Sequence, residues 1–78
     1  MAETRAYVLV ETAVGRVSGI AGALSGMPGL VSLDTVTGRY DIIIVLEAED
    51  LAEVAVLVTE HVHTIGGVVR TVTCLAVS

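Results

Sequence analysis

Apolar and polar positions along the chain follow two periods, one typical of strands and one typical of helices. The run Tyr7-Val8-Leu9-Val10 is β-branched and aromatic and lies between charges, which predicts a strand over Arg5 to Glu11. Apolar residues then recur at spacings of three and four, as on one face of a helix, and Pro28-Gly29 ends that segment. The apolar positions of this first predicted helix are Val14, Val17, Ile20, Ala21 and Leu24.

A hairpin comes next in the pattern. The β-prone segments Leu30 to Val36 and Tyr40 to Leu46 flank the turn Thr37-Gly38-Arg39 and predict two antiparallel strands. The second of these strands is the most apolar stretch of the chain.

A second helix and a last strand complete the pattern. Asp50 stands three residues before Glu53, a variant of the capping box, and predicts the start of the helix. Its apolar stripe is Leu51, Val54, Ala55, Val58, Val62 and Ile65. Gly66-Gly67 ends this helix, and Val68 to Val77 reads as a strand.

The resulting order, strand, helix, strand, strand, helix, strand, contains one unit twice. Met27-Pro28-Gly29-Leu30-Val31 and Ile65-Gly66-Gly67-Val68-Val69 occupy the same place after each predicted helix. Right-handed crossovers and short connections then favour a ferredoxin-like α+β fold, with a four-stranded antiparallel sheet and both helices on one face. No linker divides the chain, so residues 1–78 are expected to form one domain.

The predicted strands are apolar on both faces, although a sheet with one bare face normally alternates apolar and polar residues. Ile42, Ile44 and Leu46 point one way in the third strand, and Ile43 and Val45 point the other way. In the last strand Val68, Val72 and Cys74 oppose Val69, Leu75 and Val77. Helices cover only one set, so we expect the other to pair with a second copy of the chain. The alternative is a bare sheet that tolerates valine and isoleucine.

Glycines form a second pattern in the first predicted helix. Gly15, Gly19, Gly22 and Gly26 fall on the side opposite the apolar stripe. Each glycine costs up to about 1 kcal/mol of helix stability relative to alanine, so a smooth stripe suggests close approach of another backbone. A compositional preference for small residues explains it equally well.

The composition of the chain limits the classes of function that are open to it. A chain of 78 residues supports one small domain of marginal stability, and its net charge of -5, with no lysine, disfavours binding to nucleic acid. Cys74 has no partner for an internal disulfide and is expected to be a small buried thiol. The N-terminus lacks the pattern of a signal peptide, and the uncharged stretch from Val17 to Leu33 is too short and glycine-rich for a membrane span. These features predict a cytoplasmic protein with no membrane partner.

Catalytic and metal-binding patterns are not recognisable. His61 and His63 are two residues apart on a predicted helix and point to different sides, unlike helical histidines that share a metal. No serine lies in a nucleophile-elbow context, and the segment Gly15-Arg16-Val17 lacks the pattern of a phosphate loop. We therefore expect no enzyme activity, no metal site and no cofactor.

Polar residues gather at the hairpin and near the end of the chain. They are Thr37, Gly38, Arg39, Tyr40, Asp41, Glu60, Thr71 and Thr73. The run Val36 to Ile43, with Glu47 to Leu51 and Gly67 to Thr73, resembles the effector-binding domain of the Lrp/AsnC family of regulators. The resemblance covers nearly the whole chain, and the turn Thr37-Gly38-Arg39-Tyr40-Asp41 is its most specific element.

The resemblance implies dimers that pair through their sheets, assemble further, and bind amino acids or similar metabolites between dimers. By position, Thr37 to Asp41, Glu60, Thr71 and Thr73 would line the effector pocket. Loop N–H groups or Arg39 can hold a carboxylate, while Asp41, Glu60 and threonine hydroxyls can accept from an ammonium group. Arg39 stands where the family often has an acid, which affects the ligand that fits. Without the family's helix-turn-helix, the chain resembles a stand-alone module that acts through partner regulators.

Three other interpretations stay open. The polar turn can be purely structural, with Gly38 supplying backbone freedom, Tyr40 packing and Asp41 accepting from nearby amides. The chain can be a ferredoxin-like dimeric α+β barrel enzyme, although Tyr7 and Tyr40 leave few polar or aromatic groups for its cavity. It can also be a structural partner that changes the assembly of full-length regulators.

Overall fold

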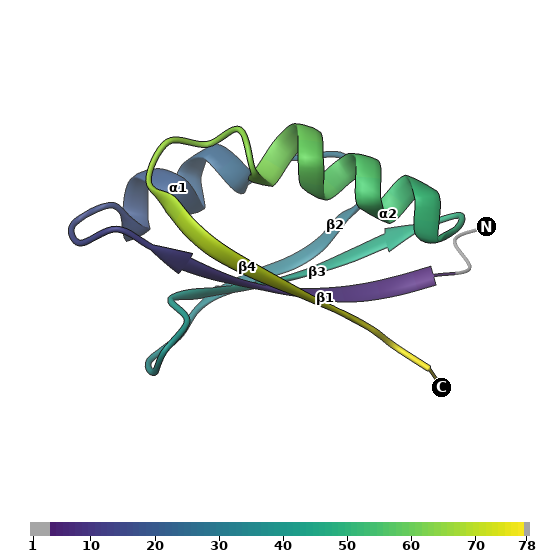
Figure 1. Cartoon of the computed structure of the whole chain (residues 1–78), viewed down its shortest axis with the longest axis horizontal. Helices are drawn as coiled ribbons and strands as arrows, with labels where there is room; N and C mark the ends of the chain where they lie inside the picture. Colours follow the sequence, from purple (N-terminus) through teal and green to yellow (C-terminus); the bar gives the residue numbers. More distant parts are fainter. Residues whose placement is uncertain (1–3, 78) are drawn as a thin grey trace.

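The computed structural model describes residues 4–77 and has the predicted order of elements (Figure 1). The first half contains β1 (Thr4–Thr12), α1 (Val17–Leu24) and β2 (Leu30–Thr35). The second half contains β3 (Ile42–Ala48), α2 (Leu51–Leu57), a π-helical turn η1 (Val58–Val62) and β4 (Val68–Leu75). Among these residues no helix is both long and apolar enough to cross a membrane.

The four strands form one antiparallel sheet in the order β2-β3-β1-β4, and both helices lie on the same side of it (Figure 1). β1 is central, so Val8 lies opposite Ile44 on one side and Thr73 on the other. β2 and β4 are the edge strands. The ferredoxin-like α+β fold predicted from the sequence is confirmed.

The core lies between the sheet and the helices. Every second residue of β3 is buried, as expected for a strand with one covered face. The largest fully buried side chains are Val8, Val10, Ile20, Leu24, Ile42, Ile44, Leu46, Val54 and Val62. All are aliphatic, so the core is held by apolar burial and close packing.

The first helix is shorter than predicted. It begins at Val17, and Val14 lies in the preceding turn, fully exposed. Gly15 and Gly26 adopt φ values of +80° and +85° outside the helix, where they form turns. The predicted stripe of four helical glycines is therefore wrong, and only Gly19 and Gly22 lie on α1.

The second helix starts as predicted and changes geometry part-way along. The Asp50 carboxylate accepts from Glu53 N (2.9 Å), and the Glu53 carboxylate accepts from Glu49 N (2.7 Å). This reciprocal pair holds the helix start in the manner of a capping box. The expected stripe is buried at Val54, Val58 and Val62, whereas Leu51 and Ala55 are exposed. The π-helical turn was not predicted from the sequence.

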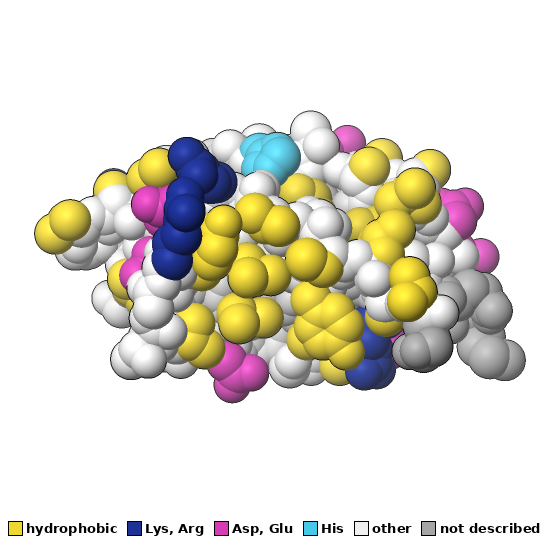
Figure 2. Space-filling view, turned by 60° about the horizontal axis from the view of Figure 1, so that its bottom comes forward, with side chains coloured by type: hydrophobic (Ala, Val, Ile, Leu, Met, Phe, Trp, Pro, Cys, Tyr) yellow, Lys and Arg dark blue, Asp and Glu magenta, His cyan; other side chains and the backbone are white. Residues whose placement is uncertain are grey.

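The side of the sheet opposite the helices, called the open face below, is apolar at its centre (Figure 2). By strand register it carries Tyr7, Leu9, Ile43, Val45, Val72 and Cys74. Tyr7 and Val72 are each 38% exposed, and Leu9, Ile43 and Val45 are partly buried by one another. The sequence therefore correctly predicted a sheet with apolar side chains on both faces.

Cys74 is exposed, so the expectation of a buried thiol is wrong. The side chain belongs to the open face of an edge strand, opposite Tyr7, and no helix covers it. A β-branched sequence context predicts a strand but does not reveal whether that strand lies at the edge of the sheet.

A polar pair borders the open face. Arg5 Nε donates to the Glu47 carboxylate (3.0 Å), and these residues lie opposite each other on β1 and β3. Hydrogen bonds to Glu47, and then to Tyr7, raise the pKa of the Arg5 guanidinium above its ordinary value. Glu11 and Arg70 face each other across β1 and β4 at another point of the border.

Candidate functional site

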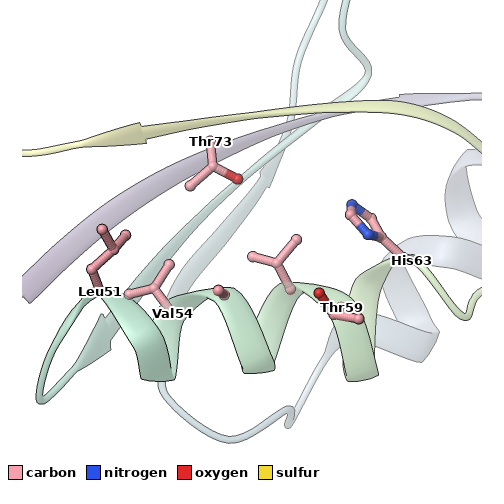
Figure 3. A pocket seen from close by; sticks show the side chains of 7 residues that line it. Leu51, Val54, Thr59, His63 and Thr73 are labelled. Carbon is pink, nitrogen blue, oxygen red and sulfur yellow. The ribbon is translucent and has the colours of Figure 1, made fainter.

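A groove of about 250 Å³ lies between the second helix and β4 (Figure 3). It exists because α2 packs over β3 and β1, and the edge strand β4 is left with little cover. The residues that line it are Leu51, Val54, Ala55, Val58, Thr59, His63 and Thr73. We call it the α2–β4 groove.

Apolar and polar groups are separated within the α2–β4 groove. Leu51 and Val54 come from the first turn of α2, and Val58 and Ala55 continue this aliphatic wall. Thr59 and His63 lie toward the other end of the helical segment, and Thr73 projects from β4 over the part of the groove formed by Leu51 and Val54 (Figure 3). Among the described lining residues none is acidic, and the only ionisable side chain is the imidazole.

His63 connects the helix layer to the last strand. Its Nε2 lies 2.9 Å from the Thr71 hydroxyl oxygen, a hydrogen-bond distance. The contact places Thr71 next to the polar end of the groove, although Thr71 is not part of the lining. Two of the predicted site residues, Thr71 and Thr73, are thus brought to one place.

Glu60 lies on η1, one residue after Thr59, and its side chain is exposed. Its backbone carbonyl accepts from the Thr64 hydroxyl (2.9 Å). Glu60 is near the groove in the chain but does not line it, because the helical rotation per residue turns it to another side.

The predicted loop residues Thr37 to Asp41 lie elsewhere in the protomer. The hairpin between β2 and β3 projects away from the helix layer, whereas the groove lies beside α2 (Figure 1). Thr37, Gly38 and Arg39 are exposed, and the Arg39 guanidinium carbon lies 5.8 Å from the centre of the Tyr40 ring. Gly38 has a φ of +122°, a conformation that favours glycine.

Asp41 has a structural contact. Its carboxylate accepts from Thr12 N (2.8 Å) and from the Thr12 hydroxyl (3.0 Å), and its own N–H donates to Val10 O (2.9 Å). These bonds hold the end of β1, where the register with β4 shifts. Asp41 thus makes the amide contact expected of a structural turn residue.

Sequence reasoning missed most of the groove. His63 was considered only as a possible metal ligand, and Val54, Val58 and Leu51 only as core positions. The contact of His63 with Thr71 joins residues eight positions apart across a helix end and a strand, so no local spacing rule indicates it. Among residues 4–77 no cluster of three or more histidine, cysteine or acidic side chains could hold a metal ion.

Comparison with a family model decides the relationship. Residues 5–78 match the model described as the Lrp/AsnC ligand-binding domain. The chain belongs to the Lrp/AsnC ligand-binding domain family. Members of this family are regulatory, ligand-binding domains of transcription regulators, and the resemblance noted in the sequence is confirmed.

Solved structures share the fold of this Lrp/AsnC domain over nearly its whole length. TTHA0845 from Thermus thermophilus is 31% identical, with a TM-score of 0.90 over 95% of this chain and 92% of that one. The hypothetical protein PHS023 from Pyrococcus horikoshii is 26% identical, with a TM-score of 0.88 over 97% of this chain and 92% of that one.

A longer protein of the same fold was solved with a small molecule. The transcriptional regulator NMB0573 from Neisseria meningitidis, in complex with L-Met, is 16% identical with a TM-score of 0.85. The match covers 96% of this chain, which spans about half (50%) of that regulator. A comparison with functionally curated proteins gave no match.

Proposed function

We propose that this Lrp/AsnC domain is a sensor that binds an amino acid or a related small metabolite and associates with copies of itself. The observation that carries the proposal is the pairing of an apolar open face with a groove that is aliphatic along one wall and polar at one end. Family membership and the neighbouring regulator solved with L-Met support a small-molecule ligand.

Self-association follows from the open face. Burying its aromatic and aliphatic surface contributes about 25 cal/mol for each Å² removed from water. The charged residues at its border, Arg5 with Glu47 and Glu11 opposite Arg70, give it the apolar centre and polar rim typical of protein interfaces. A second copy supplies a face of the same chemistry, so a dimer through the open faces is the arrangement we propose.

Further assembly would explain why the predicted site residues are divided between two places. Thr71 and Thr73 lie at the groove, and the hairpin loop from Thr37 to Asp41 projects from another side of the protomer. We propose that the loop of one subunit approaches the groove region of another. Arg39 would then bring a positive charge toward a bound carboxylate.

The regulatory output in this proposal is a change in assembly that is passed to partner regulators of the same family. A second candidate function, a purely structural assembly partner, needs the open face but no ligand. Cytoplasmic location and the absence of a catalytic role belong to the same proposal.

A thermal-shift panel tests ligand binding. The twenty amino acids are added singly to the purified chain, and its unfolding temperature is measured. A ligand present at 100 times its dissociation constant stabilises the folded state by about 2.7 kcal/mol, which raises the unfolding temperature of a domain of this size by about 10–20 °C. Stabilisation by one or a few amino acids supports the sensor. No response to any of them, with recovery of a family regulator in a pull-down, favours the assembly partner.

Light scattering tests self-association independently of any ligand. We expect a mass of at least two chains at micromolar concentration. A mass of one chain under these conditions would contradict the proposed dimer, whatever the thermal-shift panel shows.

A further inference from the structure

We propose that the α2–β4 groove takes an aliphatic monocarboxylate, with its hydrocarbon part against α2 and its carboxylate at the His63 end. In this assignment the groove contacts the carbon skeleton and the acid group of the ligand and does not recognise an α-ammonium group. The inference rests on the proposed sensor function and names the ligand class of that site.

The aliphatic wall selects the hydrocarbon. Leu51, Val54, Ala55 and Val58 present only methyl and methylene groups to the groove, and the described lining contains no aromatic side chain other than the imidazole. A charged or strongly polar ligand side chain would lose its water here without gaining a partner. The groove volume of about 250 Å³ lies just below the roughly 300–1,000 Å³ of pockets for drug-sized molecules, so the groove suits a smaller ligand. A branched acid with five or six carbons is of this size.

The polar end offers hydrogen-bond donors. A neutral imidazole has one N–H and a threonine hydroxyl has one O–H, so His63 and Thr71 together have two donors. Their 2.9 Å contact uses one of these donors. If the hydroxyl donates to Nε2, Nδ1–H remains, and if Nε2–H donates, the hydroxyl hydrogen remains. Either tautomer leaves one donor for a carboxylate.

One further hydroxyl, that of Thr59, lies toward this end of the groove, and a second, that of Thr73, projects from β4 over its aliphatic part (Figure 3). Hydroxyls and an imidazole N–H suit a carboxylate, which accepts hydrogen bonds at both oxygens. Since hydroxyls also accept, the distinction rests on the free donor at His63 and Thr71, which suits a carboxylate, while the described lining contains no carboxylate to pair with an ammonium group.

Titration calorimetry with four ligands of one carbon skeleton tests the assignment. They are 4-methylpentanoate, 4-methyl-2-oxopentanoate, leucine and 4-methylpentan-1-ol. We expect both acids without an ammonium group to bind at least as tightly as leucine, and the alcohol to bind about tenfold or more weakly, because it lacks the charged acceptor. Leucine binding tenfold tighter than 4-methylpentanoate would show that an ammonium group is recognised and would overturn the assignment.

Paired variants locate the site. Ala55→Leu fills the groove from an exposed helix position, whereas Ala52→Leu adds the same side chain at an exposed position of α2 outside the lining. We expect Ala55→Leu to weaken binding of 4-methylpentanoate about tenfold or more and Ala52→Leu to leave it unchanged. Equal affinities for the two variants, with circular dichroism showing both to be folded, would place the acid elsewhere.

A second pair addresses the polar end. His63→Ala removes the imidazole from the groove, and His61→Ala removes one that does not line it. Only the first is expected to lower affinity for the acid, with little effect on binding of the alcohol. Equal losses for acid and alcohol would contradict a carboxylate contact at His63.

Failure of this inference differs from failure of the sensor proposal. If an amino acid stabilises the chain but its affinity is unaffected by Ala55→Leu, the sensor proposal stands and the groove assignment is wrong. If neither the amino acids nor the four ligands bind, both are wrong.

Discussion

The two faces of the sheet carry the same kinds of side chain but differ in how far these side chains are buried. Ile44 on β3 is fully buried beneath the helices, whereas Ile43, the residue before it, is only partly buried on the open face. Val8 and Leu9 on β1 show the same contrast. The difference teaches that side-chain hydrophobicity alone does not define the core of this domain, since the helix layer decides which set is removed from water.

The largest expected effect comes from removing a side chain on the covered face. Ile44→Ala should lower the free energy of unfolding by about 2–5 kcal/mol, because it leaves a cavity in a fully buried site. Urea denaturation measures the loss. Ile43→Ala is the matched control, and at high dilution it should cost clearly less. If the two variants lose equal unfolding free energy at every protein concentration, the covered face contributes no more to the stability of the protomer than the open face.

A charged side chain placed on the open face should weaken self-association of the chain. Val72→Asp places an unpaired carboxylate in the proposed contact and should weaken self-association at least tenfold, or about 1.4 kcal/mol, while the protomer stays folded. Sedimentation equilibrium measures the change. Val69→Asp, three positions earlier on β4 and so on the other side of the strand, is the control. An unchanged mass distribution for Val72→Asp would argue against a contact through the open face.

Removing the cap at the start of α2 should lower the stability of the helix that covers the core. Asp50→Ala removes the side chain that accepts from Glu53 N at the start of α2. We expect a loss of about 1 kcal/mol in unfolding free energy, the usual effect of removing such a cap. Asp50→Asn should retain most of this stability, because its amide oxygen still accepts. If both variants unfold at the same denaturant concentration as the original chain, the cap contributes nothing.

The smallest expected effect is a gain in the stability of the chain. Gly19→Ala and Gly22→Ala add methyl groups on the outer side of α1, where no atom beyond the adjacent residues and the nearby backbone of the helix lies within 4 Å of the new carbon. Each should stabilise the chain by less than about 1 kcal/mol. Gly29→Ala is the contrasting control, because Gly29 has a φ of +79° and its added carbon would lie 2.9 Å from Glu47 O. Disruption of assembly by Gly19→Ala or Gly22→Ala would instead show that α1 contacts another subunit.

Local patterns were sufficient for the element order but not for the groove, of whose lining only Thr73 was among the predicted site residues. The capping residues Asp50 and Glu53, the apolar run of the third strand and the paired turns led to the ferredoxin-like fold. Periodicity did not show that Val14 lies in a turn, because a positive φ at Gly15 interrupts the helical face. Thr71 and Thr73 were selected by resemblance, but the contact of Thr71 with His63 and the place of Thr73 in the groove depend on how far the second helix lies from β4.

By itself the sequence determined which residues are apolar, the order of the elements and which side chains share a face of each strand. These properties depend on neighbours within a few residues. Only the tertiary structure decided that Cys74 is exposed, that Asp41 holds Thr12, and that α2 leaves a groove beside β4. The physical reason is that each of these features depends on the distance between elements far apart in the chain, and packing of the whole core sets that distance.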